Sequence, residues 1–171
     1  MDLYIVRHAA AEDALPGGSD ATRPLSKRGR KRFASSVQGL ERLGVRFDRL
    51  MFSPLLRAQE TAEELMRLCD EDDGCETEVV LELAAAPGPD LLERLARATD
   101  GSLALVGHEP WLSQLAAWLV CGWRVWEEGS EGCVFELGKG GVIHLAGEAR
   151  PGAMALVAAY PSSTLLELAR R

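Results

Sequence analysis

Four residues of this sequence have side chains suited to binding and transferring a phosphoryl group. Arg7 and His8 are adjacent, whereas Arg57 and His108 lie far from them along the chain. The planar guanidinium group of arginine binds phosphate oxygens through two parallel hydrogen bonds. A neutral histidine can attack phosphorus, after which water hydrolyses the phosphorylated enzyme. Together these residue types indicate phosphoryl transfer through His8.

Each of the four lies at or soon after the end of an apolar run that is typical of a buried strand. The runs are residues 3–6, 50–52 and 103–106. In open α/β sheets, ligands bind outside the carboxyl ends of the strands. A lone histidine or arginine at such a place is more often a structural or solvated group. Three polar strand ends in one sheet, however, predict one cationic pocket.

Two helix N-termini are expected behind this pocket. Ser53 and Pro54 read as the N-cap and first residue of a helix, and Pro110 suits the first helical position after His108. Free N–H groups and the helix dipole at such ends favour anions. The sequence thus predicts helix starts that support a phosphate site.

The remaining hydrophobic pattern alternates between strands and helices, which predicts parallel βαβ units covered on both faces. After residue 133 the spacing becomes that of hairpins, with Lys139 in a Gly-rich turn. We therefore expect a single α/β domain over residues 1–171, a three-layer α/β/α sandwich whose mostly parallel sheet gains an antiparallel strand or hairpin near the C-terminus. The other expected elements are helices over residues 27–43, capped by Ser26 and ended by Gly44, and over 90–98, and strands over 79–81, 134–137, 142–145 and 154–158.

The composition excludes several classes of function. A net charge of −7 on 171 residues argues against broad nucleic-acid binding. The N-terminus lacks the basic stretch of a signal peptide, and no apolar run reaches the length that spans a bilayer. Four cysteines without a C-x-x-C pair, together with three histidines, do not make a zinc site, so free thiols in a reducing compartment are expected. We expect a cytoplasmic monomer without metal, cofactor, membrane or nucleic-acid partner.

Four segments of the chain, in this order, resemble the histidine phosphatase superfamily, the phosphoglycerate-mutase-like or RHG enzymes. Within it the chain is similar to the small SixA-type phosphohistidine phosphatases. The resemblance covers residues 2 to about 120, and the last fifty residues match loosely. At Ala9 the broader superfamily has glycine, while alanine is frequent in the small branch. The segments are LYIVRHA from residue 3, RPLSKRG from residue 23, FSPLLRAQETA from residue 52 and LVGHEP from residue 105.

The resemblance implies a role for each residue of the predicted pocket. Arg7, His8, Arg57 and His108 would form the phosphate pocket, with His8 as the nucleophile and the others stabilising charge on the phosphoryl oxygens. Arg23 would lie either near the pocket mouth or on the open surface. No carboxylate cluster for Mg²⁺ accompanies them.

A general acid is needed when the leaving group is an alkoxide. Many relatives have a glutamate after the third strand, and Glu82 is the positional match. An exposed strand-end carboxylate is the alternative interpretation of Glu82, and Glu12 and Glu109 are weaker candidates. Phosphohistidine would need a strong acid less, because its imidazole leaves easily once protonated.

The loops after the first and third strands are brief, which leaves little chain for a lid over a small metabolite. We therefore expect the substrate to be phosphohistidine on a folded partner, such as a phosphotransfer domain in signal transduction. A phosphatase for a small phosphomonoester, such as a sugar phosphate or nucleotide, is the alternative. A mutase is less favoured because it must exclude water from its phosphoenzyme. A noncatalytic phosphate-binding module would not need all four pocket residues.

Overall fold

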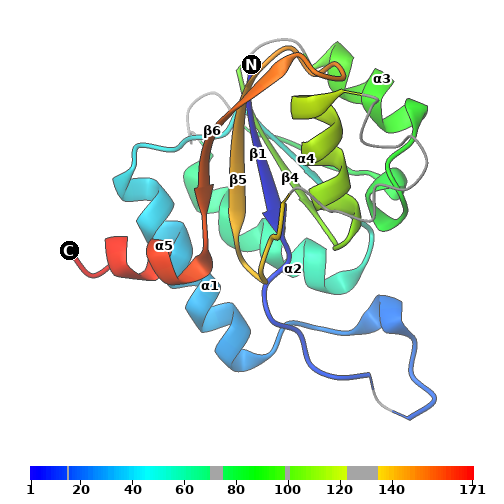
Figure 1. Cartoon of the computed structure of the whole chain (residues 1–171). Coiled ribbons are helices and arrows are strands. Elements are labelled where there is room, and N and C mark those ends of the chain that lie inside the picture. Colours follow the sequence, from blue (N-terminus) through cyan, green and yellow to red (C-terminus); the bar gives the residue numbers. More distant parts are fainter. Residues whose placement is uncertain (15, 70–74, 99–100, 123–134) are drawn as a thin grey trace.

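A six-stranded sheet forms the centre of the protein (Figure 1). The structure is a computed structural model, and it describes residues 1–14, 16–69, 75–98, 101–122 and 135–171. The strands are β1 (Asp2–Arg7), β2 (Arg49–Phe52), β3 (Glu76–Val79), β4 (Ser102–Gly107), β5 (Val142–Gly147) and β6 (Met154–Tyr160). Their order in the sheet is β3-β2-β4-β1-β5-β6. The strands β1 to β4 are parallel, and β5 and β6 are antiparallel additions.

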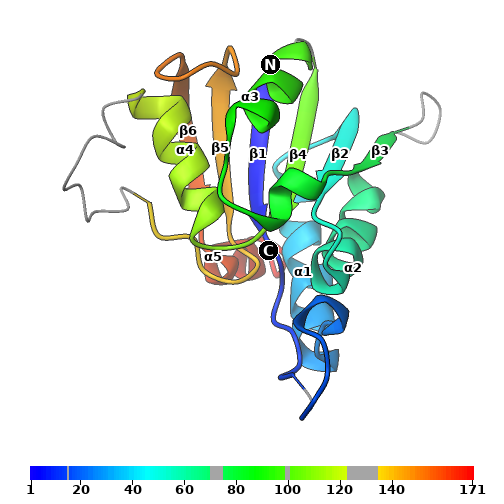
Figure 2. The same cartoon turned by 90° about the vertical axis from the view of Figure 1, so that its right-hand side faces the viewer.

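Helices cover both faces of this sheet (Figures 1 and 2). On one face lie α1 (Lys27–Arg42), α2 (Leu56–Leu65) and α5 (Ser162–Leu168), and on the other lie α3 (Pro89–Arg97) and α4 (Trp111–Cys121). The predicted three-layer α/β/α sandwich with antiparallel C-terminal strands is confirmed. Among the described helices, none has the length and apolar character needed to cross a membrane.

Strand β1 illustrates how the sequence produces the two cores. Leu3 and Ile5 join the apolar cluster beneath α3 and α4, while Tyr4 and Val6 join the cluster beneath α1, α2 and α5. Successive side chains of a strand point to opposite faces, so a strand covered on both sides must be apolar throughout. The unbroken apolar run before Arg7 is therefore a consequence of the three layers.

Strands β1, β2 and β4 end at the same edge of the sheet. Arg7 lies opposite Gly107 in the pair of β1 and β4, and Phe52 lies opposite Val106 in the pair of β2 and β4. The three polar segments that follow these strands consequently emerge next to one another.

The two prolines do not occupy the first helical positions, contrary to the sequence-based prediction. Helix α2 begins at Leu56, and Ser53 instead accepts a hydrogen bond from the Leu55 amide at 3.3 Å. Helix α4 begins at Trp111, with Pro110 at the N-cap position after a cis peptide bond. Short loops therefore separate both strand ends from their helices, and these loops carry the polar side chains.

The structure also differs from the expected helices and strands at three places. Strand β3 ends at Val79, and Leu81–Ala84 forms a 3₁₀ turn in which Leu81 is 70% exposed. Residues 135–137 form no strand, and the Leu137 carbonyl accepts a hydrogen bond from the Arg7 side chain. Residue 134 lies outside the described residues. The sequence does not predict α5, which buries only Leu165 fully and so has no clear periodicity.

Cys69 and Cys75 form a disulfide, which corrects the expectation that all cysteines are free thiols. Their Cα atoms are 5.4 Å apart, within the usual range for such a bond. The 3₁₀ turn Met66–Leu68 after α2 ends beside the start of β3, and this proximity is not visible in the cysteine spacing. Cys121 is free and exposed, and Cys133 lies outside the described residues.

Candidate functional site

The two histidines of the predicted pocket are neighbours because β1 and β4 are paired. The His8 amide donates to the Gly107 carbonyl at 3.1 Å, which joins the two segments just after their strands. The ring centroids of His8 and His108 are 5.0 Å apart, with 50° between the ring planes. The two residues are only 8% and 7% exposed. Residues a hundred positions apart thus share one small buried space.

The ring of His8 is held in one tautomer. Its Nδ1 lies 2.7 Å from the Ala9 carbonyl oxygen, and a carbonyl only accepts, so Nδ1 carries the hydrogen and Nε2 the lone pair. Burial lowers the pKa of His8 to about 4 and outweighs the hydrogen bond to Ala9, while the charges of Arg57, Arg7 and Lys139 lower it further. His8 is therefore neutral near pH 7 and has a nucleophilic nitrogen.

His108 is neutral as well. Its Nε2 lies 2.8 Å from the hydroxyl of Ser53, which is completely buried. Its Nδ1 is buried and has no hydrogen-bond partner within the described residues. The pKa of His108 is lowered to about 3, mainly by burial and further by its interactions with His8 and Arg57. An orphaned, buried ring nitrogen is rare in proteins.

Arg7 and Arg57 bring two guanidinium groups to this edge. Arg7 Nη1 donates to the Leu137 carbonyl at 2.8 Å, whereas its buried Nε has no partner in the part of the chain that the structure describes. Arg57 is 7% exposed and donates through both terminal nitrogens to Asp20, to the carbonyl at 2.9 Å and to the carboxylate at 3.0 Å. The structure thus brings together the four residues that the sequence singled out.

A single hydroxyl connects the loop of His8 with the helix of Arg57. Thr61 accepts a hydrogen bond from the Ala9 amide at 3.1 Å and donates one to the Arg57 carbonyl at 2.6 Å. Thr61 is completely buried, so water does not compete for either bond. The separation between the nucleophile and Arg57 is fixed in this way.

Arg23 lies at the outer rim of the pocket and is linked to Arg57 through Asp20. Its Nη1 donates to the Asp20 carboxylate at 2.8 Å and its Nε donates to the Glu12 carbonyl at 2.8 Å. Asp20 in turn binds Arg57, and the pKa of its carboxyl is lowered, first of all by the hydrogen bond from Arg23. Arg23 therefore positions Asp20, which in turn binds Arg57.

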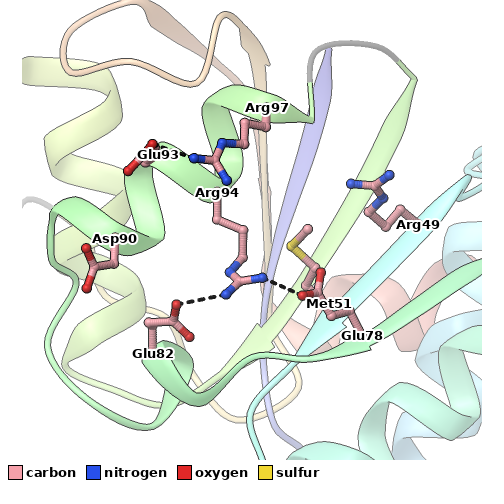
Figure 3. Close-up of a pocket in the computed structure, with 8 residues that line it drawn as sticks. All are labelled: Arg49, Met51, Glu78, Glu82, Asp90, Glu93, Arg94 and Arg97. Atoms are coloured by element: carbon pink, nitrogen blue, oxygen red, sulfur yellow. Dashed lines mark hydrogen bonds and ion pairs between the residues drawn. The ribbon is translucent and has the colours of Figure 1, made fainter.

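The structure does not bring Glu82 to the two histidines. Its carboxylate pairs with Arg94 at 3.0 Å, and Arg94 also binds Glu78, in a hollow of about 430 Å³ beside α3 (Figure 3). The hydrogen bond from its own amide, followed by Arg94, lowers the pKa of Glu82. Its carboxylate is therefore held ionised, whereas a proton donor must be protonated. Among the described residues, no three His, Cys, Asp or Glu gather as a metal site.

Lys139 lies near His8, which the sequence does not predict. Its charge contributes to the lowered pKa of His8, and the amide of the next residue, Gly140, donates to the carbonyls of Arg7 at 3.1 Å and His8 at 3.2 Å. The turn is where the sequence places it. Its position beside the pocket depends on the pairing of β5 with β1, and the sequence predicts an antiparallel addition to the sheet without indicating that its partner is β1.

Glu109 is the carboxyl group beside His108. It is partly buried and accepts a hydrogen bond from the Ser113 hydroxyl at 2.8 Å. Burial raises the pKa of Glu109, partly offset by Ser113 and the charge of Arg7. In contrast to Glu82, Glu109 therefore has an increased protonated fraction.

The two buried histidines predict a loss of stability in mild acid. Their folded pKa values lie below the ordinary 6.5, so the unfolded chain binds more protons and the free energy of unfolding falls as the pH drops below about 6.5. Between pH 7.0 and 5.0 we expect a loss on the order of 2 kcal/mol for each histidine. Urea unfolding at both pH values measures it. Over this pH range the free energy of unfolding of a His108→Asn variant should fall less than that of the wild type. Equal decreases would contradict a neutral, buried His108.

A protein-family model and several known proteins match this chain. Residues 3–81 match the model of the histidine phosphatase superfamily, branch 1. An uncharacterized protein of Picosynechococcus sp. is 37% identical over 155 residues, which cover 88% of each chain. The mitochondrial serine/threonine-protein phosphatase Pgam5 of Drosophila ananassae is 40% identical over 65 residues, which are 38% of this chain and 22% of that protein.

Solved structures share the fold over nearly the whole chain. The protein histidine phosphatase SixA complexed with tungstate has a TM-score of 0.77 at 24% identity, over 96% of this chain and 99% of that one. A phosphoserine phosphatase from Entamoeba histolytica, in complex with 3-phosphoglyceric acid, has a TM-score of 0.68 at 18% identity, over 96% and 99%. The alpha-ribazole phosphatase from Shigella flexneri has a TM-score of 0.68 at 20% identity, over 95% and 97%.

Proposed function

The chain belongs to branch 1 of the histidine phosphatase superfamily and is a phosphatase, and we propose that it removes the phosphoryl group from phosphohistidine on a protein. The observation that carries the proposed chemistry is the state of His8. A neutral ring whose Nδ1 hydrogen is held by the Ala9 carbonyl presents the Nε2 lone pair for attack.

The proposed reaction has two steps. His8 Nε2 attacks phosphorus in line, a bond forms between Nε2 and phosphorus, and the bond from phosphorus to the substrate imidazole breaks as that imidazole takes up a proton. Water then hydrolyses the phosphorylated His8, which releases inorganic phosphate and restores the neutral ring. The protein contributes mainly position and charge to such a transfer.

Three groups around His8 are proposed to bind the phosphoryl oxygens. Arg7 Nε and His108 Nδ1 are buried polar atoms without a partner in the described residues, and the Arg57 fork is held by Asp20 at the pocket mouth. The Ser53 hydroxyl accepts the Leu55 amide hydrogen, and its own hydrogen is positioned to donate to His108 Nε2. That arrangement leaves the ring hydrogen on His108 Nδ1, where it donates to the phosphoryl group.

The protein substrate is supported by two independent observations. The loop after β3 contains only a 3₁₀ turn before α3, so no lid is inserted there. The segment between β1 and α1, residues 8–26, is longer than the brief loop expected, and it contacts Arg57 through Asp20. The relative Pgam5 and the similarly folded SixA are named as phosphatases of proteins. The alternative of a small phosphomonoester is supported by the shared fold of a phosphoserine phosphatase and an alpha-ribazole phosphatase. The cytoplasmic location, the monomeric state and the lack of nucleic-acid or membrane partners stay predictions.

Direct comparison of substrates tests the proposal. The protein is incubated with a histidine-containing phosphotransfer domain phosphorylated by phosphoramidate, and separately with p-nitrophenyl phosphate. We expect the domain to be dephosphorylated with a kcat/KM at least tenfold above that of the ester, because protein contacts add binding energy. Turnover of small esters with an unchanged phosphodomain would favour the small-phosphomonoester alternative. Binding of phosphate without any turnover would favour a noncatalytic module.

We further propose that Glu109, rather than Glu82, donates the proton to a leaving group that needs one. The Glu109→Gln variant is expected to lose about 10²-fold in kcat/KM for phenyl phosphate and much less for p-nitrophenyl phosphate, whose leaving group needs little protonation. The matched Glu82→Gln variant should stay within about twofold of the wild type for both esters, because Arg94 holds Glu82 ionised. A loss in the Glu82 variant that grows with the leaving-group pKa would assign the acid to Glu82 instead.

A further inference from the structure

Helices α1 and α5 enclose a hollow whose charged lining is entirely cationic. Gly39 allows their close approach, because a Cβ atom at this position would lie 2.2 Å from the Leu165 carbonyl oxygen. The hollow has a volume of about 320 Å³, and its charged lining residues are Arg28, Lys31, Arg32 and Arg170. None of the residues that line it is acidic. On a chain of net charge −7, this is an unusual concentration of positive charge.

This hollow continues toward His8. A second hollow of about 210 Å³ adjoins it, since Arg32 lines both, and it is also lined by Ala9 and Lys139. Ala9 directly follows the nucleophile, and the charge of Lys139 acts on His8. Figure 1 places α1 and α5 next to each other at the edge where β1 ends. We call Arg28, Lys31, Arg32, Lys139 and Arg170 the α1–α5 basic surface.

The side chains of the α1–α5 basic surface are exposed and are not neutralised by the protein itself. Within the described residues, none of the five forms an ion pair. Arg30 on the same helix provides the contrast, because it pairs with Glu60, Glu63 and Glu64 of α2. Helix α1 thus has one side whose charge is used for folding and one side whose charge is available to a partner.

We propose that the α1–α5 basic surface docks an acidic surface of the protein that carries the phosphohistidine. This inference rests on the proposed function, since it names how the substrate protein is held. Complementary charge guides the encounter and increases the association rate, and it fixes the orientation of the partner. A partner seated on α1 and α5 would extend past Lys139, so that its phosphohistidine enters the pocket beside His8.

Charge reversal far from the reacting atoms tests this surface. The Arg28→Glu/Lys31→Glu variant is compared with the wild type on two substrates that share the same P–N bond, an acidic phosphotransfer domain phosphorylated on histidine and free phosphohistidine. We expect kcat/KM for the domain to fall about tenfold at low salt and to lose most of its salt dependence. Turnover of free phosphohistidine, which makes no surface contact, should stay within about twofold.

The control variant is Arg97→Glu/Arg150→Glu, which changes the net charge equally at the opposite edge of the sheet. Arg97 ends α3, and Arg150 lies in the turn between β5 and β6. The control variant should keep its activity on the phosphorylated domain. Equal losses in both double variants, or none in either, would overturn the docking surface while the proposed function stands. A wild-type protein that hydrolyses p-nitrophenyl phosphate but leaves the domain phosphorylated would overturn both.

Discussion

The His8→Ala variant is expected to lose phosphatase turnover by a factor on the order of 10⁴ or more, because removal of an enzyme nucleophile has effects of this size. Nδ1 of His8 is engaged with Ala9, and Nε2 is the atom available to form the bond to phosphorus. The wild-type protein, quenched in acid-free denaturant during turnover, should gain the mass of one phosphoryl group on the peptide that contains His8. The variant should gain none.

The third histidine of the chain provides a matched control. His144 lies on β5, pairs with Asp2 at 2.6 Å and stacks on Tyr4 with ring centroids 4.2 Å apart. His144→Ala removes the same side chain and is expected to change stability modestly and kcat by less than twofold. A His8→Ala protein that is folded by circular dichroism and still turns over within tenfold of the wild type would contradict the assignment of the nucleophile.

The second large effect is expected at Arg57. Arg57→Ala should lower kcat/KM by on the order of 10³, and Arg57→Lys by about 10², because lysine keeps the charge but not the planar fork that binds two oxygens at once. Burial increases the effect, since a guanidinium group at 7% exposure faces little competition from water. Steady-state rates with p-nitrophenyl phosphate measure both losses.

Arg94→Lys is the matched control for Arg57→Lys. Arg94 also forms ion pairs through its terminal nitrogens, with Glu78 and Glu82, but in the separate hollow beside α3 (Figure 3). We expect the Arg94 variant to keep its rate within about twofold. If the two lysine variants had the same activity, the guanidinium geometry at Arg57 would not contribute to the reaction. Arg57→Lys also changes the Asp20 contacts that hold residues 20–22. Thermal unfolding measures the effect of that change on stability, separately from the effect on the rate.

Much of the architecture could be predicted from the sequence because it depends on local periodicity. The apolar residues 3–6 and 103–106 must be covered on both faces, and Ser26 caps α1 as expected by accepting the Gly29 amide at 3.0 Å. Arg7 and His8 could be placed at a strand end, because only the strand itself was needed to locate them.

What could not be predicted depends on contacts between distant segments. Ser53 reads as a helix cap, yet its hydroxyl turns to His108, a residue of another strand end. Lys139 reads as a turn residue, and its proximity to His8 follows only from the placement of β5 beside β1. Glu82 fits the family position, but α3 supplies Arg94 as a partner that no sequence spacing reveals.

The hydrogen bond between Arg7 and the Leu137 carbonyl also bears on the order in which the parts of the pocket are synthesised. It joins residues 130 positions apart, and the Gly140 amide closes the same wall of the pocket. At 5 to 20 residues per second, a ribosome needs roughly 6 to 26 s to make that length of chain. The nucleophile is therefore synthesised well before the wall that orients its neighbour. A nascent chain therefore carries an incomplete pocket until β5 has emerged to pair with β1.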